Sequence, residues 1–223
     1  MKLKFHPEYI MLALFLAVLA LYINIDGIPL THPGNIKAAD PFYHAIVAET
    51  IVETGQWHFY PAWLSQNNQR MVNIQPPFLY MNTAILSIFS DIPVWAVMYF
   101  LVCLAAALSV LFLYLTCTEL FESKLLSLIA ASFAAFPLSL QAWLYGMYIG
   151  FWIQVTGYMF LMAYLWLFVK HWKKYETWHL PVFGVILSAV LLVHPQDLVV
   201  LALPTLLLVV KRWSDTRDWQ RTL

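Results

Sequence analysis

Long apolar runs constrain this 223-residue chain more than any motif does. They lie at residues 9–25, 94–117, 125–144, 152–169 and 180–210, and only the last contains a charged residue, Asp197. A run of about 20 apolar residues matches the ~30 Å hydrocarbon core of a bilayer. Because 62% of the residues are hydrophobic and 11% are charged, polar side chains are too few to cover a water-soluble globule. The sequence predicts an all-α polytopic integral membrane protein.

The number of crossings follows from the first and last runs. The first is long for the apolar region of a signal peptide, and no small-x-small cleavage motif follows it, so we expect a retained helix. The last is interrupted by "HPQD" at residues 194–197, which predicts two helices joined by a tight turn. The chain is therefore expected to have about six transmembrane helices.

A shorter run, residues 78–89 after "QPP", is more typical of an interfacial helix than of a crossing one. If it does not cross, ten of the 12 lysines and arginines lie on the cytoplasmic side, and only Lys37 and Arg70 lie outside. If it crosses, only Lys2 and Lys4 stay inside. The first arrangement predicts an external loop at 26–93 between the N-terminal segment 1–25 and a five-helix bundle at 94–213, with a cytoplasmic tail at 214–223.

The external loop contains the stretch "AADPFYHAIVAETIVETGQW". It predicts an amphipathic helix over 41–54, with Asp40 as the N-cap before Pro41 and Gly55 as the stop. At 100° per residue Asp40 and His44 share the packing face of this helix, whereas Glu49 and Glu53 face water. A helix cap with an interfacial aromatic ring, or a functional pair, would each explain Asp40 and His44.

Charge and cysteine content add little. The chain has 12 basic and 12 acidic residues, so nothing favours a nucleic-acid partner. Cys103 and Cys117 fall in one apolar run and read as small core residues.

Four segments, in order, resemble the membrane module of the C-type polyprenyl-phosphate glycosyltransferases. "DPFYHAIVAETIVETGQW" resembles the first external loop of the oligosaccharyltransferase catalytic subunit, the archaeal type especially. "NIQPPFLYMNTAILSIFSDIP" is similar to the P-P-L-x-Y helix of the superfamily, and "LFLYLTCTELFESKLLSLIAASFAAFPLSL" is similar to a later membrane segment. "GVILSAVLLVHPQDLVVLALP" resembles the hairpin that carries H-P.

The resemblance implies transfer of a sugar or oligosaccharide from a polyprenyl-phosphate or -diphosphate carrier at the extracytoplasmic face. It assigns the catalytic carboxylate to Asp40, as general base or as ligand of a divalent cation, Mg²⁺ or Mn²⁺. His44 and Asp197 are further candidate metal ligands. Lys37, Arg70 and His194 are candidates for binding the lipid-linked substrate.

The chain also departs from the family pattern. The next external loop, "YGMYIGF" at 145–151, has no carboxylate, so Asp197 is the nearest external substitute for the family's second acidic motif. Family members are longer and carry a W-W-D-type motif that is absent here. We therefore keep three alternatives: the N-terminal half of a longer enzyme, a short member that needs a partner subunit, and a non-catalytic subunit that binds the lipid carrier or scaffolds an enzyme. A small transporter is disfavoured because no charged residue lies within a predicted crossing and no inverted repeat is visible.

Overall fold

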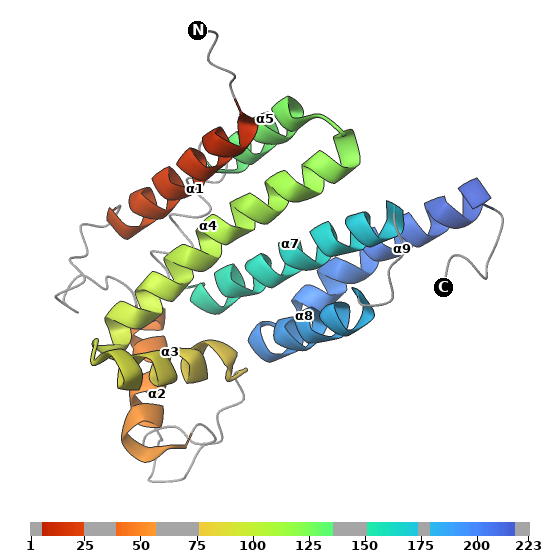
Figure 1. The fold of residues 1–223 in the computed structure, drawn as a ribbon. Helices are drawn as coiled ribbons and strands as arrows, with labels where there is room; N and C mark the ends of the chain where they lie inside the picture. The colour runs from red at the N-terminus through yellow and green to blue at the C-terminus, as the bar shows by residue number, and fades with distance from the viewer. Residues whose placement is uncertain (1–5, 25–38, 57–75, 136–150, 174–178, 217–223) are drawn as a thin grey trace, which may run out of the picture.

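The computed structural model describes residues 6–24, 39–56, 76–135, 151–173 and 179–216, and within these ranges the regular structure is entirely helical (Figure 1). The prediction of an all-α fold is confirmed. The described helices are α1 (Pro7–Asn24), α2 (Ala39–Thr54), α3 (Phe78–Ser90), α4 (Val94–Phe121), α5 (Lys124–Ala135), α7 (Trp152–Lys173), α8 (His179–Val193) and α9 (Asp197–Thr216).

The long helix α4 forms the centre of the fold and packs against α1, α5 and α7. Two aromatic contacts show that α4 and α7 run parallel. The ring centroids of Tyr99 and Trp152 are 6.1 Å apart, and those of Phe112 and Trp166, farther along both helices, are 5.9 Å apart. The beginnings of α4 and α7 therefore lie at the same end of the bundle, which we call the cavity end.

The two short helices α2 and α3 also lie at the cavity end, beside the start of α4 (Figure 1). With 13 residues, α3 is about 20 Å long at 1.5 Å per residue, too short to cross a bilayer. It stops at Asp91, whose left-handed φ of 57° caps the helix, and Pro93 precedes α4. The predicted short helix at 78–89 is confirmed.

Helix α2 begins one or two residues earlier than its sequence predicts. Asp40 lies inside the first helical turn and is not the N-cap, because Ala39 is already helical. Pro41 fits the first turn because the amide it lacks has no helical partner there. The C-terminal stop is confirmed: Gly55 has φ +68°, and its N–H donates to the Ile51 carbonyl at 2.8 Å.

The break at "HPQD" is confirmed as a tight turn between α8 and α9. The His194 N–H closes α8 by donating to the Val190 carbonyl at 2.8 Å, and the Asp197 N–H donates to the His194 carbonyl at 2.9 Å. Since α8 returns along α7, this turn also lies at the cavity end.

Among the described residues, α4 and α7 are long and apolar enough to cross a membrane, whereas α1, α3, α5, α8 and α9 contain shorter apolar helices. Residues 136–144 of one predicted crossing lie outside the described residues.

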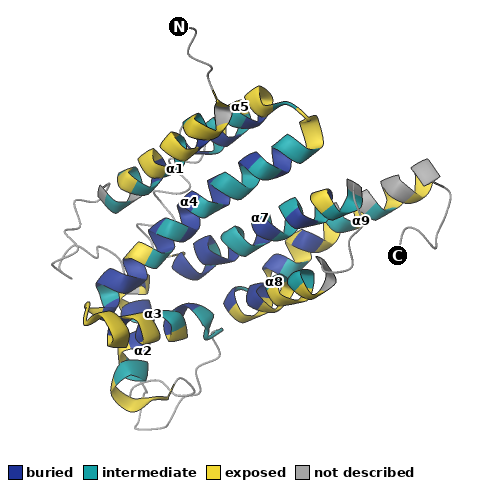
Figure 2. Cartoon of the chain, in the orientation of Figure 1, coloured by how far each residue is buried: buried dark blue, intermediate teal, exposed yellow. Residues whose placement is uncertain are grey.

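Large apolar side chains are exposed on the outer faces of α1, α8 and α9, and Figure 2 shows these faces in yellow. Examples are Leu16, Val185 and Leu203. Exposed apolar faces of this extent favour a lipid environment.

Candidate functional site

A cavity of about 520 Å³ lies at the cavity end. Its walls come from α2, from the start of α7 and from the turn between α8 and α9. The lining residues are Asp40, Tyr43, His44, Pro76, Phe151, Ile153, Gln154, His194, Pro195 and Gln196. The fold thus brings together three predicted site residues, Asp40, His44 and His194, that are up to 154 positions apart in the sequence (194 − 40). Lys37 and Arg70 lie outside the described residues.

His44 connects α2 with α3 and α7. Its side chain is buried, and its Nδ1 lies 2.8 Å from the hydroxyl oxygen of Tyr80 on α3. The imidazole centroid is also 6.3 Å from the ring of Trp152, the first residue of α7. Because Tyr80 and Trp152 are themselves buried, His44 joins three helices at the cavity wall.

Asp40, one turn before His44, is exposed and lines the cavity. Both Asp40 and His44 line this cavity, so they lie on the same side of α2, but His44 is buried there and Asp40 is not. Glu49 and Glu53 are exposed, as predicted. A carboxylate at the open part of the cavity can accept a hydrogen bond or a proton from a bound ligand.

His194 and Asp197 form a second pair beside the cavity. The Nδ1 of His194 lies 2.8 Å from the Oδ1 of Asp197. His194 is partly exposed and lines the cavity, whereas Asp197 is 2% exposed. The other carboxylate oxygen of Asp197, Oδ2, has no hydrogen-bond partner among the described residues. Asp197 is not among the residues that line the cavity, so its contact with the cavity runs through the side chain of His194.

Gly157 on α7 makes room for this pair. A Cβ added at residue 157 would overlap the Oδ2 of Asp197 and would lie 3.0 Å from the Cβ of His194. A glycine in the middle of a helix costs about 0.5–1 kcal/mol relative to alanine. The carboxylate of Asp197 therefore occupies the space that the Cβ of any other residue at position 157 would fill.

The described residues offer few ligands for the predicted Mg²⁺ or Mn²⁺. They contain no group of three or more histidine, cysteine, aspartate or glutamate side chains placed to hold a metal ion. Within the described part of the cavity wall, Asp40 supplies the carboxylate oxygens that these ions prefer. The predicted set of Asp40, His44 and Asp197 stays a prediction.

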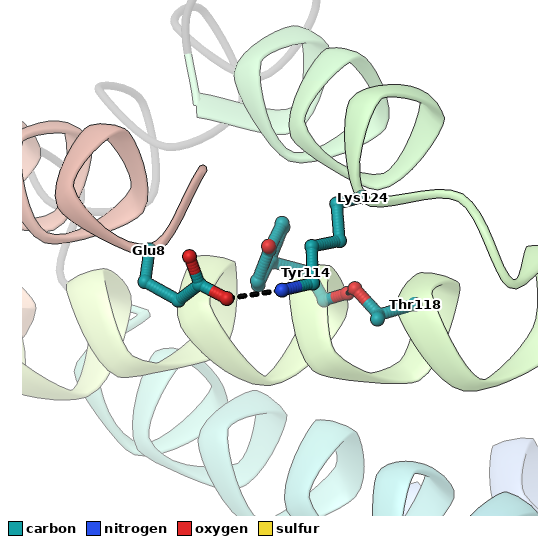
Figure 3. A network of polar contacts seen from close by, with 4 residues as sticks. All are labelled: Glu8, Tyr114, Thr118 and Lys124. Atoms are coloured by element: carbon teal, nitrogen blue, oxygen red, sulfur yellow. Dashed lines mark hydrogen bonds and ion pairs between the residues drawn. The ribbon is translucent and has the colours of Figure 1, made fainter. Parts of the chain in front are cut away.

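The opposite end of the bundle carries a different polar contact. Figure 3 shows the Lys124 ammonium, at the start of α5, reaching the Glu8 carboxylate at the start of α1, with Tyr114 and Thr118 of α4 nearby. This hydrogen bond lowers the pKa of Glu8 and raises the pKa of Lys124. Lys170, near the end of α7, lies over the ring of Trp166, 5.1 Å from its centroid. Within the described ranges, the helix segments at the cavity end contain no lysine or arginine.

An apolar groove lies farther along α7, α8 and α9. It has a volume of about 360 Å³. It is lined by Tyr164, Leu187, Leu198, Leu201, Ala202, Thr205, Leu206 and Val209. Its walls come from the same helices that frame the His194 side of the cavity.

No protein-family model, no curated protein and no solved structure matches this chain.

Several residues of the site cannot be found by motif. Tyr80 and Trp152 look like ordinary aromatic residues of apolar segments, and their contacts with His44 depend on tertiary packing. Gln154 and Gly157 leave a weak signal, because an amide and a glycine are unusual near the start of an apolar helix.

Proposed function

We propose that this chain is the membrane module of a glycosyltransferase that transfers sugar from a polyprenyl-phosphate or -diphosphate carrier to an acceptor. The observation that carries the proposal is the cavity at one end of an apolar bundle. There Asp40, His44 and His194, three residues that the sequence singled out, line the same space.

In this proposal the acceptor group lies next to Asp40 and attacks the anomeric carbon of the sugar. The bond between that carbon and the phosphate oxygen breaks, and its electron pair leaves with the phosphate. Asp40 takes the proton that the acceptor loses, since an exposed carboxylate on the cavity wall is free to receive it. No step uses a cation.

The lipid part of the carrier would lie in the groove along α7 and α9. An isoprenoid chain is apolar and needs an apolar wall, which residues such as Leu198 and Leu206 supply. The sugar-phosphate head would then reach the cavity at the end of the same helices.

The extracytoplasmic location of the cavity and the six crossings are part of the proposal. Lys124 and Lys170 lie toward the end opposite the cavity, and loops rich in lysine and arginine stay in the cytoplasm. The exposed apolar faces of α1, α8 and α9 support further crossings beside α4 and α7.

The test is a transfer assay with the full chain in membranes that supply the acceptor. The substrate is a polyprenyl-phosphate carrier with a radiolabelled sugar, and the readout is the label that leaves the lipid fraction. Asp40→Asn should lower transfer at least about a hundredfold, because general-base catalysis contributes roughly 10²–10⁴. The matched control is Glu49→Gln, an exposed carboxylate on another face of α2. Unchanged transfer by Asp40→Asn would exclude Asp40 as the base.

A non-catalytic subunit that binds the lipid carrier is the second candidate. It is favoured by the loop at 145–151, which has no carboxylate where the family has its second acidic motif. The two candidates differ in one measurement, because only the enzyme releases sugar from the carrier when the purified chain is the sole protein present.

A further inference from the structure

We propose that Gly157 and Asp197 position His194 so that Nδ1 donates its hydrogen to the Asp197 carboxylate and Nε2, in the neutral ring, accepts a hydrogen bond from a sugar hydroxyl in the cavity. The sugar as ligand class rests on the proposed function. The positioning of His194 rests on the geometry alone.

The first step concerns the proton on the imidazole. An ionised carboxylate only accepts hydrogen bonds, so the 2.8 Å contact with Oδ1 of Asp197 requires that Nδ1 of His194 donates. In a neutral imidazole the second nitrogen then has a lone pair and no proton. Of the two neutral tautomers, the buried carboxylate therefore selects the one in which Nε2 is an acceptor.

The second step concerns rigidity. His194 and Asp197 are joined twice. Their side chains are in contact, and the Asp197 N–H donates to the His194 carbonyl at 2.9 Å. On the other side, the carboxylate fills the space left by the missing Cβ of Gly157. Asp197 is thus confined between α7 and His194, and it is a positioning residue that acts through His194.

The third step concerns the ligand. His194 lines the cavity together with Asp40, whose carboxylate also accepts hydrogen bonds. The Nε2 of Gln154 donates one hydrogen to the Tyr158 hydroxyl at 2.6 Å, and the amide keeps a second N–H as donor and its oxygen as acceptor. Acceptors match sugar hydroxyls, which can donate, whereas the Asp40 carboxylate repels the oxygens of an ionised phosphate. The geometry therefore favours the sugar of the carrier over its phosphate as the partner of His194.

The experiment uses the full chain in lipid nanodiscs with ¹⁵N-labelled histidine rings, in buffer alkaline enough to keep imidazoles neutral. His194→Gln identifies the resonances of residue 194. The wild-type spectrum should show His194 protonated at Nδ1, and protonation at Nε2 would overturn the positioning. Gly157→Ala should shift His194 toward the Nε2-protonated form, whereas Gly184→Ala, which meets no atom within 4 Å, should not.

The ligand class is tested in the same samples with dolichyl-phosphate mannose and with dolichyl phosphate. The mannose-bearing lipid should shift the Nε2 resonance of His194, and the phosphate alone should not. One lost hydrogen bond should weaken binding of dolichyl-phosphate mannose to Gly157→Ala by about tenfold. An equal shift with both lipids, or no shift with either, would overturn the sugar assignment. Absence of sugar transfer would contradict the proposed function but would leave these spectra, and the inference drawn from them, unchanged.

Discussion

Within the described residues, each end of the bundle contains an acid–base pair, and the two pairs differ in their surroundings. At the cavity end, Asp197 is buried against Gly157 and bonded to His194. At the opposite end, Glu8 and Lys124 bond across two helix beginnings while both side chains stay exposed. The two pairs differ in burial. A buried carboxylate that loses its partner has no water to replace it, whereas an exposed ion pair exchanges its partner for water at little cost.

The first prediction is that the two ends of the bundle lie on opposite sides of the membrane. In a chain with Cys103→Ala and Cys117→Ala, single cysteines at Gln56 and Gln196 should react with an impermeant thiol reagent added outside intact cells. Lys124→Cys, at the opposite end, should react only after the cells are permeabilised. Because labelling is all or none, this is the largest expected effect. Reaction of all three from outside would contradict the proposed topology.

The cavity end should be sensitive to a single added carbon. Gly157→Ala forces the buried carboxylate of Asp197 to move, and we expect a loss of about 1–3 kcal/mol in the free energy of unfolding. Gly184→Ala is the matched control, because this helical glycine faces open space and alanine there should gain about 0.5–1 kcal/mol. Thermal unfolding of both purified variants in the same detergent measures the two effects. Equal unfolding temperatures would show that the pair at 194 and 197 is not confined.

A smaller loss is expected where α2 joins α3. Tyr80→Phe removes the hydroxyl that lies 2.8 Å from the Nδ1 of His44, and a buried hydrogen bond contributes about 1 kcal/mol. Tyr9→Phe, at a residue 71% exposed, removes the same atom from the surface and should change nothing measurable. The same unfolding assay compares them, and a larger loss from Tyr9→Phe would reverse the ranking of the two ends.

The smallest effect is expected at the exposed pair. Glu8→Gln should leave the unfolding temperature within the error of the assay, because both partners are exposed and salt screens them. Folding lowers the pKa of Glu8, so its contribution is present above the ordinary carboxyl range and is lost as the pH falls through the pKa of the folded state. Folding raises the pKa of Lys124, so that contribution is lost only as the pH rises through its raised value. A marked loss of stability at neutral pH would mean that exposure does not weaken this pair.

Much of the fold follows from local chemistry that the sequence displays. The break at residues 194–197, the stop at Gly55 and the short helix after "QPP" each depend on proline, glycine or the length of an apolar run, and the structure has all three. The start of α2 was misjudged because aspartate before proline serves equally well as a cap or within the first turn.

The site was less predictable because its contacts join segments far apart in the chain. Periodicity placed His44 on the packing side of α2 correctly, but it could not identify Tyr80 or Trp152 as its neighbours. The relation between Gly157 and Asp197 depends on how α7 meets the turn between α8 and α9, and nothing in either segment alone indicates it.

The exposed face of α3 has a consequence for how a ligand would arrive. Met81, Ile85 and Phe89 point away from the bundle while Tyr80, on the same helix, holds the cavity wall through His44. In the proposed topology this apolar face would lie at the depth of the lipid headgroups. A substrate anchored in the bilayer would then find the cavity by diffusing sideways within the membrane plane. Such a search covers two dimensions instead of three, and its rate depends on the density of the carrier per unit area of membrane, not on its concentration in water.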